Sequence, residues 1–100
     1  MRWRVARVVG GSMLSTLSPG QLLLVDRRRA GRVGDVVLAL DPRSGVEVVK
    51  RLTAIEADGF WLEGDAHDPR TAASSADSWV FGAVPALTGV VIFPFPRGGT

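Results

Sequence analysis

The sequence predicts an all-β domain, a twisted and partly closed barrel of short strands. Apolar residues either alternate with polar ones or form runs of a few residues, and both patterns are typical of strands. Proline, glycine and aspartate separate these segments at short intervals, and no segment has a convincing helical period. One hundred residues, 46% of them hydrophobic and 22% charged, suffice for one folded domain, which we take as residues 1–100.

The first part of the chain supplies three of the predicted strands. Residues 2–9, RWRVARVV, place Arg2 and Arg4 on one side of a strand and Trp3 and Val5 on the other. A Ser-Pro-Gly turn follows. Two further strands are predicted at residues 21–26 and 33–40.

The second part continues the pattern. DPRSG at 41–45 is typical of a hairpin loop and leads into a strand at 46–55. Asp58-Gly59 suits a tight type I′ turn. Three prolines, at 85, 94 and 96, limit the last segments to sheet edges or strand ends. The predicted strands of this part are completed by residues 60–64, 79–84 and 86–95.

Composition excludes several classes of function. Without cysteine there is no disulfide framework, no thiolate metal site and no thiol nucleophile. The net charge is only +2, and the basic run DRRRAGR at 26–32 has no interleaved aromatic residue, which favours a solvated loop over a nucleic-acid patch. His67 is the only histidine and lies in a polar segment, so neither a histidine triad nor a metal site is expected. No cofactor is expected.

No apolar run is long enough for a transmembrane helix, and the N-terminal residues lack the apolar stretch of a signal peptide. We therefore expect a soluble chain that stays in the cytoplasm, where it is made.

Lys50 is the single lysine, beside eleven arginines. In its strand the alternation points Lys50 inward with aliphatic neighbours and Arg51 outward. Burial lowers the pKa of an amine, and a neutral amine can act as a general base, which arginine cannot. The alternative is a lysine at a strand end that reaches water.

Ser12 is the natural partner for such a base, because a serine is weakly nucleophilic until its proton is accepted. Gly10 and Gly11 allow a sharp bend and the approach of backbone N–H groups to a reacting carbonyl. A third feature is the polar segment 64–78, which lacks apolar periodicity and is longer than most loops; it is either functional or disordered.

Four pieces of the sequence, in order, resemble the type I signal peptidase superfamily: GGSMLSTL…PGQLLLVD, GDVV, VVKRL and GD…SADS…FG, within residues 8–93. The resemblance implies a signal-peptidase-like or repressor-peptidase-like β-fold and a Ser-Lys dyad. It makes Ser12 the nucleophile, Lys50 the general base and Ser75 the serine that orients the lysine amine. It also implies that the backbone at Gly10, Gly11 and Ser12 forms the oxyanion hole. Site-supporting residues are implied at Met13, Gly64, Asp65, Asp77 and Ser78.

Met13 would form a wall of the substrate pocket, or else fill the core.

The chain departs from the family pattern at four positions, which puts efficiency in doubt more than reaction type. Some relatives have a hydroxyl-bearing residue two positions before the nucleophile, where this chain has Gly10. Ser15 occupies a position where the family often has proline. Ala66 replaces an asparagine, and Trp79 replaces an arginine that would pair with an aspartate.

In its small size and in its expected lack of a membrane anchor, the chain resembles the nickel-type superoxide dismutase maturation proteases. The implied partner is a protein precursor, nickel superoxide dismutase, from which an N-terminal propeptide is removed. Three alternatives stay open: a type I signal peptidase acting on exported preproteins, a self-cleaving repressor-type peptidase, and a degenerate β domain that binds peptides without cutting them. The repressor-type enzymes usually lack the GD…SxDS motif and carry a DNA-binding domain, and no helical module fits here.

Overall fold

A computed structural model describes residues 1–14, 16–66 and 77–96, and this part of the chain is built on one six-stranded antiparallel sheet. The all-β prediction is confirmed. The strands are β1 (Trp3–Arg7), β2 (Leu22–Asp26), β3 (Val36–Leu40), β4 (Glu47–Glu56), β5 (Gly59–Glu63) and β6 (Gly89–Pro94).

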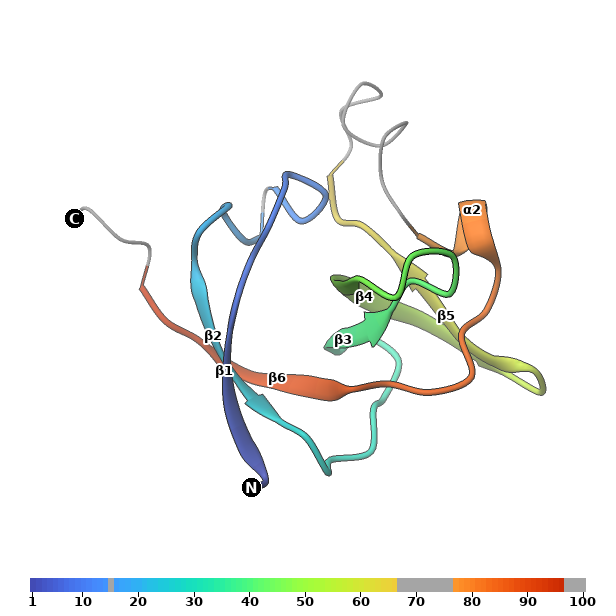
Figure 1. The fold of residues 1–100 in the computed structure, drawn as a ribbon, viewed down its shortest axis with the longest axis horizontal. Helices are drawn as coiled ribbons and strands as arrows, with labels where there is room; N and C mark the ends of the chain where they lie inside the picture. Colours follow the sequence, from blue (N-terminus) through green and yellow to red (C-terminus); the bar gives the residue numbers. More distant parts are fainter. Residues whose placement is uncertain (15, 67–76, 97–100) are drawn as a thin grey trace.

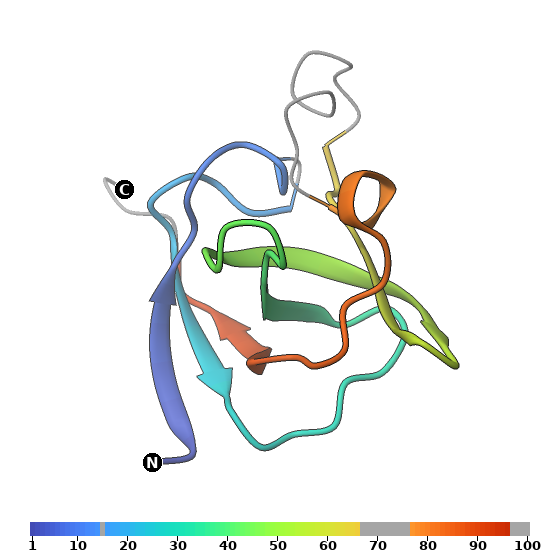
Figure 2. The ribbon, with the colours of Figure 1, turned by 45° about the vertical axis from the view of Figure 1, so that its right-hand side comes forward.

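The strand order is β1-β2-β6-β3-β4-β5, so the last strand of the sequence is inserted between β2 and β3. Figures 1 and 2 show the sheet curled into a half-barrel, with β1 and β5 as its two edges. Pro94 is the last residue of β6. This agrees with the expectation that proline, which lacks an N–H donor, is limited to strand ends.

Side chains on both faces of the sheet are buried, in two core clusters. Leu38 of β3 belongs to one cluster, and its neighbours Val37 and Ala39 belong to the other, as the alternation of a strand requires. The first cluster contains Ala6, Val8, Met13, Leu17, Leu23, Val25 and Leu38. The second contains Val37, Ala39, Leu52, Leu62, Val84 and Val90.

The prediction of a strand at 79–84 is wrong. Residues Ser78–Phe81 form a short helix, labelled α2 in Figure 1, and Val84 alone makes an isolated bridge to Phe60. Asp77 caps the first turn by accepting the Trp79 N–H, and Gly82 ends the helix with a φ of 79°. An N-capping aspartate and a C-terminal glycine outweigh the strand preference of the apolar residues between them.

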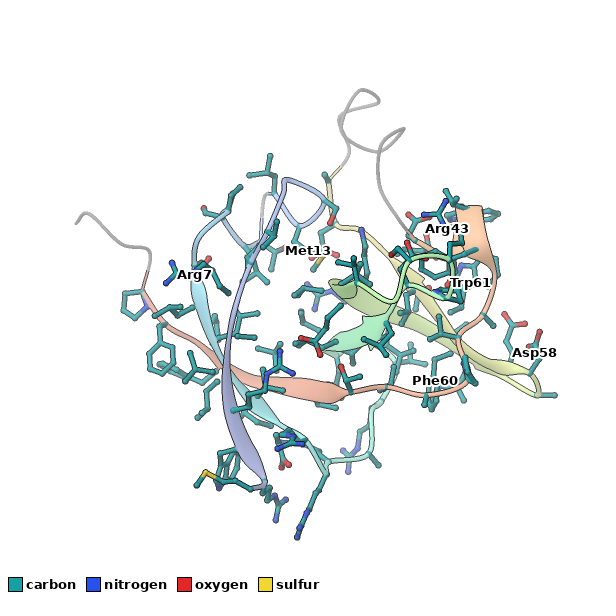
Figure 3. The ribbon with its side chains drawn as sticks, in the orientation of Figure 1. Arg7, Met13, Arg43, Asp58, Phe60 and Trp61 are labelled. Atoms are coloured by element: carbon teal, nitrogen blue, oxygen red, sulfur yellow. The ribbon has the colours of Figure 1, made fainter. Side chains whose placement is uncertain are left out.

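The turn between β4 and β5 lies one residue earlier than predicted. Glu56 pairs with Gly59, so Ala57 and Asp58 form the two-residue loop at the tip of the hairpin, where Figure 3 labels Asp58. Gly59 lies in β5 and not in the turn, and it is required there by its backbone conformation and by a close contact. Its φ is 137°, and a Cβ there would lie 2.2 Å from the carbonyl oxygen of Val84.

Candidate active site

Ser12 lies in a tight loop between β1 and β2. The chain bends at Gly10, whose φ of 79° favours glycine. The loop is then closed by the Leu14 N–H, which donates to the Gly11 carbonyl at 3.1 Å, and by the Leu17 N–H, which donates to the Met13 carbonyl at 2.7 Å. Ser12 is therefore presented, half-buried, on a structured turn.

Met13 fixes this loop to the sheet. Its side chain is 1% exposed and packs in the core cluster that also holds Leu17 and Leu38. Figure 3 shows Met13 directed into the interior of the half-barrel. The interpretation of Met13 as a wall of the substrate pocket is therefore corrected: its apolar side chain is buried in the core and anchors the loop on which Ser12 lies.

Two hydrogen bonds join the Ser12 loop to the segment that follows β5. The Ala66 N–H donates to the Ser12 carbonyl at 2.9 Å, and the Thr16 hydroxyl donates to the Asp65 carboxylate at 2.7 Å. Asp65 also accepts from Arg51 of β4, at 2.6 Å from Nη2 and 3.2 Å from Nε. The Asp65 carboxylate therefore connects the loop to the strand that carries Lys50.

Lys50 lies in β4 directly opposite Val37 of β3, and only 3% of it is exposed. Its inward orientation is confirmed, with Leu52 buried on the same face, while Arg51 points to the other face. Burial lowers the pKa of the Lys50 amine below its ordinary value of 10.5, and the negative charge of Asp77 partly opposes this shift. The amine is thus moved toward the neutral form that a general base requires.

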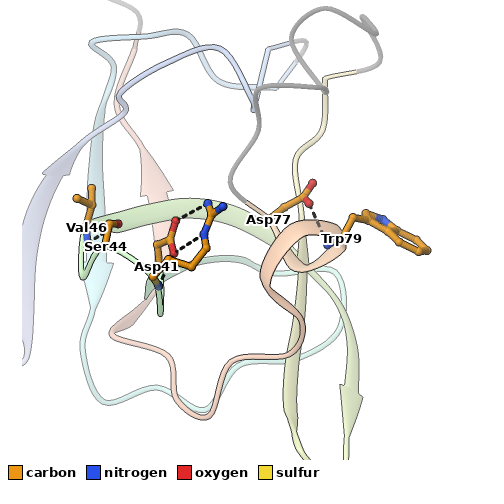
Figure 4. Close-up of polar contacts among 6 residues, drawn as sticks. Asp41, Ser44, Val46, Asp77 and Trp79 are labelled. Atoms are coloured by element: carbon orange, nitrogen blue, oxygen red, sulfur yellow. Dashed lines mark hydrogen bonds and ion pairs between the residues drawn. The ribbon is translucent and has the colours of Figure 1, made fainter.

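Asp77 and Ser78 position α2 beside β5. The Asp77 carboxylate accepts the Trp79 N–H at 3.0 Å, as the dashed line in Figure 4 shows. The buried hydroxyl of Ser78 accepts the Leu62 N–H of β5 at 2.8 Å. The expected supporting role of these two residues corresponds to a helix cap and a helix–strand hydrogen bond, and Asp77 in addition exerts its charge on Lys50.

The expected dyad itself is not seen as a contact. Within the part of the chain that the structure describes, no hydrogen bond joins the Ser12 hydroxyl to the Lys50 amine, so the dyad stays a prediction. The Ser12 N–H, expected in the oxyanion hole, has no acceptor among residues 1–14, 16–66 and 77–96. Gly64 is half-buried immediately before Asp65. Ser75, the predicted orienting serine, lies outside the described residues, as do Ser15 and His67.

Sequence reasoning missed Arg51 and Thr16 as site residues. It expected an arginine partner for Asp77 or Asp65 at the position of Trp79, whereas the guanidinium that pairs with Asp65 comes from Arg51, immediately after Lys50. The basic pair at 50–51 was the available signal: because adjacent strand residues point to opposite faces, one can be buried while the other forms an ion pair. Trp79 instead donates its indole N–H to Glu63 at 3.0 Å and makes an edge contact with Trp61.

The described residues offer no metal centre. Within residues 1–14, 16–66 and 77–96, no three histidine, aspartate or glutamate side chains gather as ligands. Nor does the described chain contain a helix long and apolar enough to cross a membrane.

The described structure is a curled antiparallel sheet in which Asp65 connects the Ser12 loop to β4, the strand of the buried Lys50. The family model for Peptidase S24-like proteins matches residues 3–84, and the chain belongs to this family. The family match supports a serine peptidase-like domain. It does not single out the nickel-type superoxide dismutase maturation proteases. A comparison with curated protein sequences found no match.

Proposed function

We propose that this chain is a serine endopeptidase in which Ser12 is the nucleophile and Lys50 the general base. The observation that carries the proposal is the burial of the single lysine, whose pKa is lowered, in the strand to which Arg51 and Asp65 connect the Ser12 loop. Membership of the Peptidase S24-like family supports the same reaction class.

In the proposed reaction, the neutral Lys50 amine accepts the proton of the Ser12 hydroxyl as the serine oxygen attacks the scissile carbonyl carbon. The resulting oxyanion receives a hydrogen bond from the Ser12 N–H. The C–N bond then breaks as protonated Lys50 returns the proton to the leaving amine, which leaves an ester on Ser12. Water, deprotonated by Lys50, hydrolyses the ester and restores the enzyme. Ser75 orients the Lys50 amine.

As substrate we propose a protein precursor with a short N-terminal propeptide, nickel superoxide dismutase in particular. The test is the intact mass of such a precursor co-expressed with this chain. We expect loss of the propeptide with the wild type and none with Ser12→Ala or Lys50→Met. Ser44→Ala, an exposed hairpin serine, is the matched control and should process normally. An untrimmed precursor in the presence of folded wild-type protein would overturn this substrate assignment.

A second candidate, a domain that binds peptides without cutting them, is favoured by one observation: in the described structure no hydrogen bond joins Ser12 to Lys50. Catalytic hydrogen bonds are often long in the absence of substrate and tighten when it binds. Isothermal titration of the precursor's propeptide region against wild type and Ser12→Ala separates the two functions. Equal binding with no product from either protein would establish the non-catalytic function, and a product with wild type alone would exclude it.

A further inference from the structure

A polar pocket of about 520 Å³ lies between the start of β1, the β2–β3 connection, the start of β4 and the segment before β6. In Figures 1 and 2 the N-terminus and the β2–β3 connection are at one end of the molecule, and the loop after β1 is at the opposite end. The pocket is therefore distinct from the candidate active site. Its lining residues are Met1, Arg4, Arg27, Arg28, Glu47 and Thr88.

The floor of this pocket is a fixed polar network. Arg4 of β1 bonds both carboxylate oxygens of Glu47 of β4, through Nη1 at 2.9 Å and through Nη2. The Thr88 hydroxyl donates to the same carboxylate at 2.7 Å. These bonds lower the pKa of Glu47, which stays ionised at neutral pH. A guanidinium has five N–H donors, so Arg4 keeps donors beyond the two that Glu47 accepts.

The rim is also held in place. Asp26, 1% exposed, accepts the Arg28 N–H at 2.9 Å and the Arg2 guanidinium at 3.0 Å. The Arg27 N–H donates to the Arg2 carbonyl at 2.7 Å. The buried carboxylate of Asp26 fixes the backbone of this turn. The side chains of Arg27 and Arg28 therefore start from fixed backbone positions, unlike those of arginines on a loosely attached loop.

The charge of the pocket is unbalanced. Three arginines line it against one carboxylate, which leaves a net charge of +2. Arg27 donates to a neutral carbonyl, that of Met1, and Arg28 makes no ion pair with any carboxylate of the described chain. Guanidinium groups bind phosphate and carboxylate oxygens through paired N–H donors.

We propose that this pocket is a binding site for a phosphate-rich anion of the size of a triphosphate group. The volume is in the range of small-molecule sites, about 300–1,000 Å³. Arg27 and Arg28 bind the terminal phosphates, and Arg4 meets the ligand at the floor. Glu47 opposes the ligand's charge and limits the affinity. The triphosphate group of a free nucleotide and the backbone of a nucleic acid share this chemistry.

Isothermal titration of the full chain tests the proposal, with inorganic tripolyphosphate and a single-stranded 12-nucleotide DNA as separate probes at low salt. A charge-assisted hydrogen bond corresponds to roughly a tenfold change in affinity or more. Arg28→Ala should therefore weaken tripolyphosphate binding about tenfold. Glu47→Gln should strengthen it. Arg29→Ala, which removes a neighbouring arginine that does not line the pocket, should change it by less than about threefold.

Equal losses in the Arg28→Ala and Arg29→Ala variants would show a diffuse basic surface and overturn the proposal, as would the absence of binding by the wild type. Preferential binding of tripolyphosphate identifies a free polyphosphate or nucleotide as the ligand. Preferential binding of the DNA, with the same order of variants, identifies a nucleic-acid backbone. Arg7→Ala, at the far end of β1, is the charge-matched control for folding and for net charge.

Discussion

The Asp65 carboxylate accepts hydrogen bonds from Arg51 Nη2 at 2.6 Å and from Arg51 Nε at 3.2 Å, and the hydroxyl of Thr16 donates to the same carboxylate. The ion pair therefore joins the segment after β5 to β4, the strand of Lys50, and the Thr16 hydrogen bond joins both to the loop of Ser12. The geometry is paired and partly buried, with 30% of the Arg51 side chain and 16% of the Asp65 side chain exposed. Such pairs contribute more than exposed ones.

Asp65→Asn should lower the free energy of unfolding by about 1–2 kcal/mol, because Arg51 and Thr16 lose a charged acceptor. Urea denaturation measures this loss, and hydrogen exchange should show faster opening of residues 10–17. Asp58→Asn, in the exposed turn between β4 and β5, should leave both unchanged. If the two variants have equal stability and exchange, Asp65 does not hold the loop.

Lys50→Met should stabilise the fold at neutral pH by about 1–3 kcal/mol, because the desolvation cost of the buried ammonium, which exceeds the opposing effect of Asp77 on its pKa, is removed with an apolar side chain of similar length. The pKa of Lys50 is lowered in the folded state, so the penalty is fully present below the folded-state pKa. It is relieved as pH rises toward the unfolded value of 10.5.

Thermal unfolding of both proteins between pH 6 and pH 10 measures this difference, with roughly 4–8 °C expected for each kcal/mol. The gap between Lys50→Met and wild type should narrow as pH rises. A wild type that is more stable than the variant at pH 6, or a gap that widens with pH, would contradict the assigned burial penalty.

Asp77→Asn should lower the pKa of Lys50 further, because the charge that favours the ammonium is removed. Asparagine caps a helix about as well as aspartate, so α2 should be retained. The rate at which a fluorophosphonate labels the protein, measured against pH, should then rise at lower pH than in wild type. Asp58→Asn provides the charge-matched control. A shift to higher pH in Asp77→Asn would reverse the assigned electrostatic effect.

Gly59→Ala should destabilise the fold severely, by about 3 kcal/mol or more, since the new Cβ collides with the Val84 backbone and the φ of 137° is unfavourable. Gly45→Ala separates these two causes, because Gly45 also has a positive φ, of 75°, but nothing lies within 4 Å of its Cβ position. It should cost only about 1 kcal/mol. Similar losses in the two variants, measured by urea denaturation, would assign the effect to backbone conformation alone.

Much of the fold was predictable because alternation and turn residues act locally. Lys50 is an example: its burial follows from the period of one strand. The position of β6 between β2 and β3 was not predictable, since nothing in its own sequence encodes which strands it pairs with. The strand expected at 79–84 failed because the prediction relied on the apolar residues, whereas Asp77 and Gly82, the cap and stop of α2, determine the local structure.

The candidate site divides in the same way. Ser12 and Lys50 could be chosen from chemistry and from a family resemblance. The bond of Asp65 to Arg51 depends on how β4 and the end of β5 lie in three dimensions, which no local pattern specifies. Met13 illustrates the opposite error, because a residue next to the predicted nucleophile was assigned to the pocket although the core buries it.

Covalent labelling tests the proposed activation of Ser12 by Lys50 without knowledge of the substrate. The protein is treated with a fluorophosphonate, and the modified residue is mapped by mass spectrometry in wild type, Lys50→Met and Lys50→Arg. We expect an adduct on Ser12 in the wild type and its loss in both variants, because neither the methionine nor the arginine side chain can accept the serine proton. An adduct that forms equally in Lys50→Met, or one on another serine, would contradict the activation of Ser12 by Lys50.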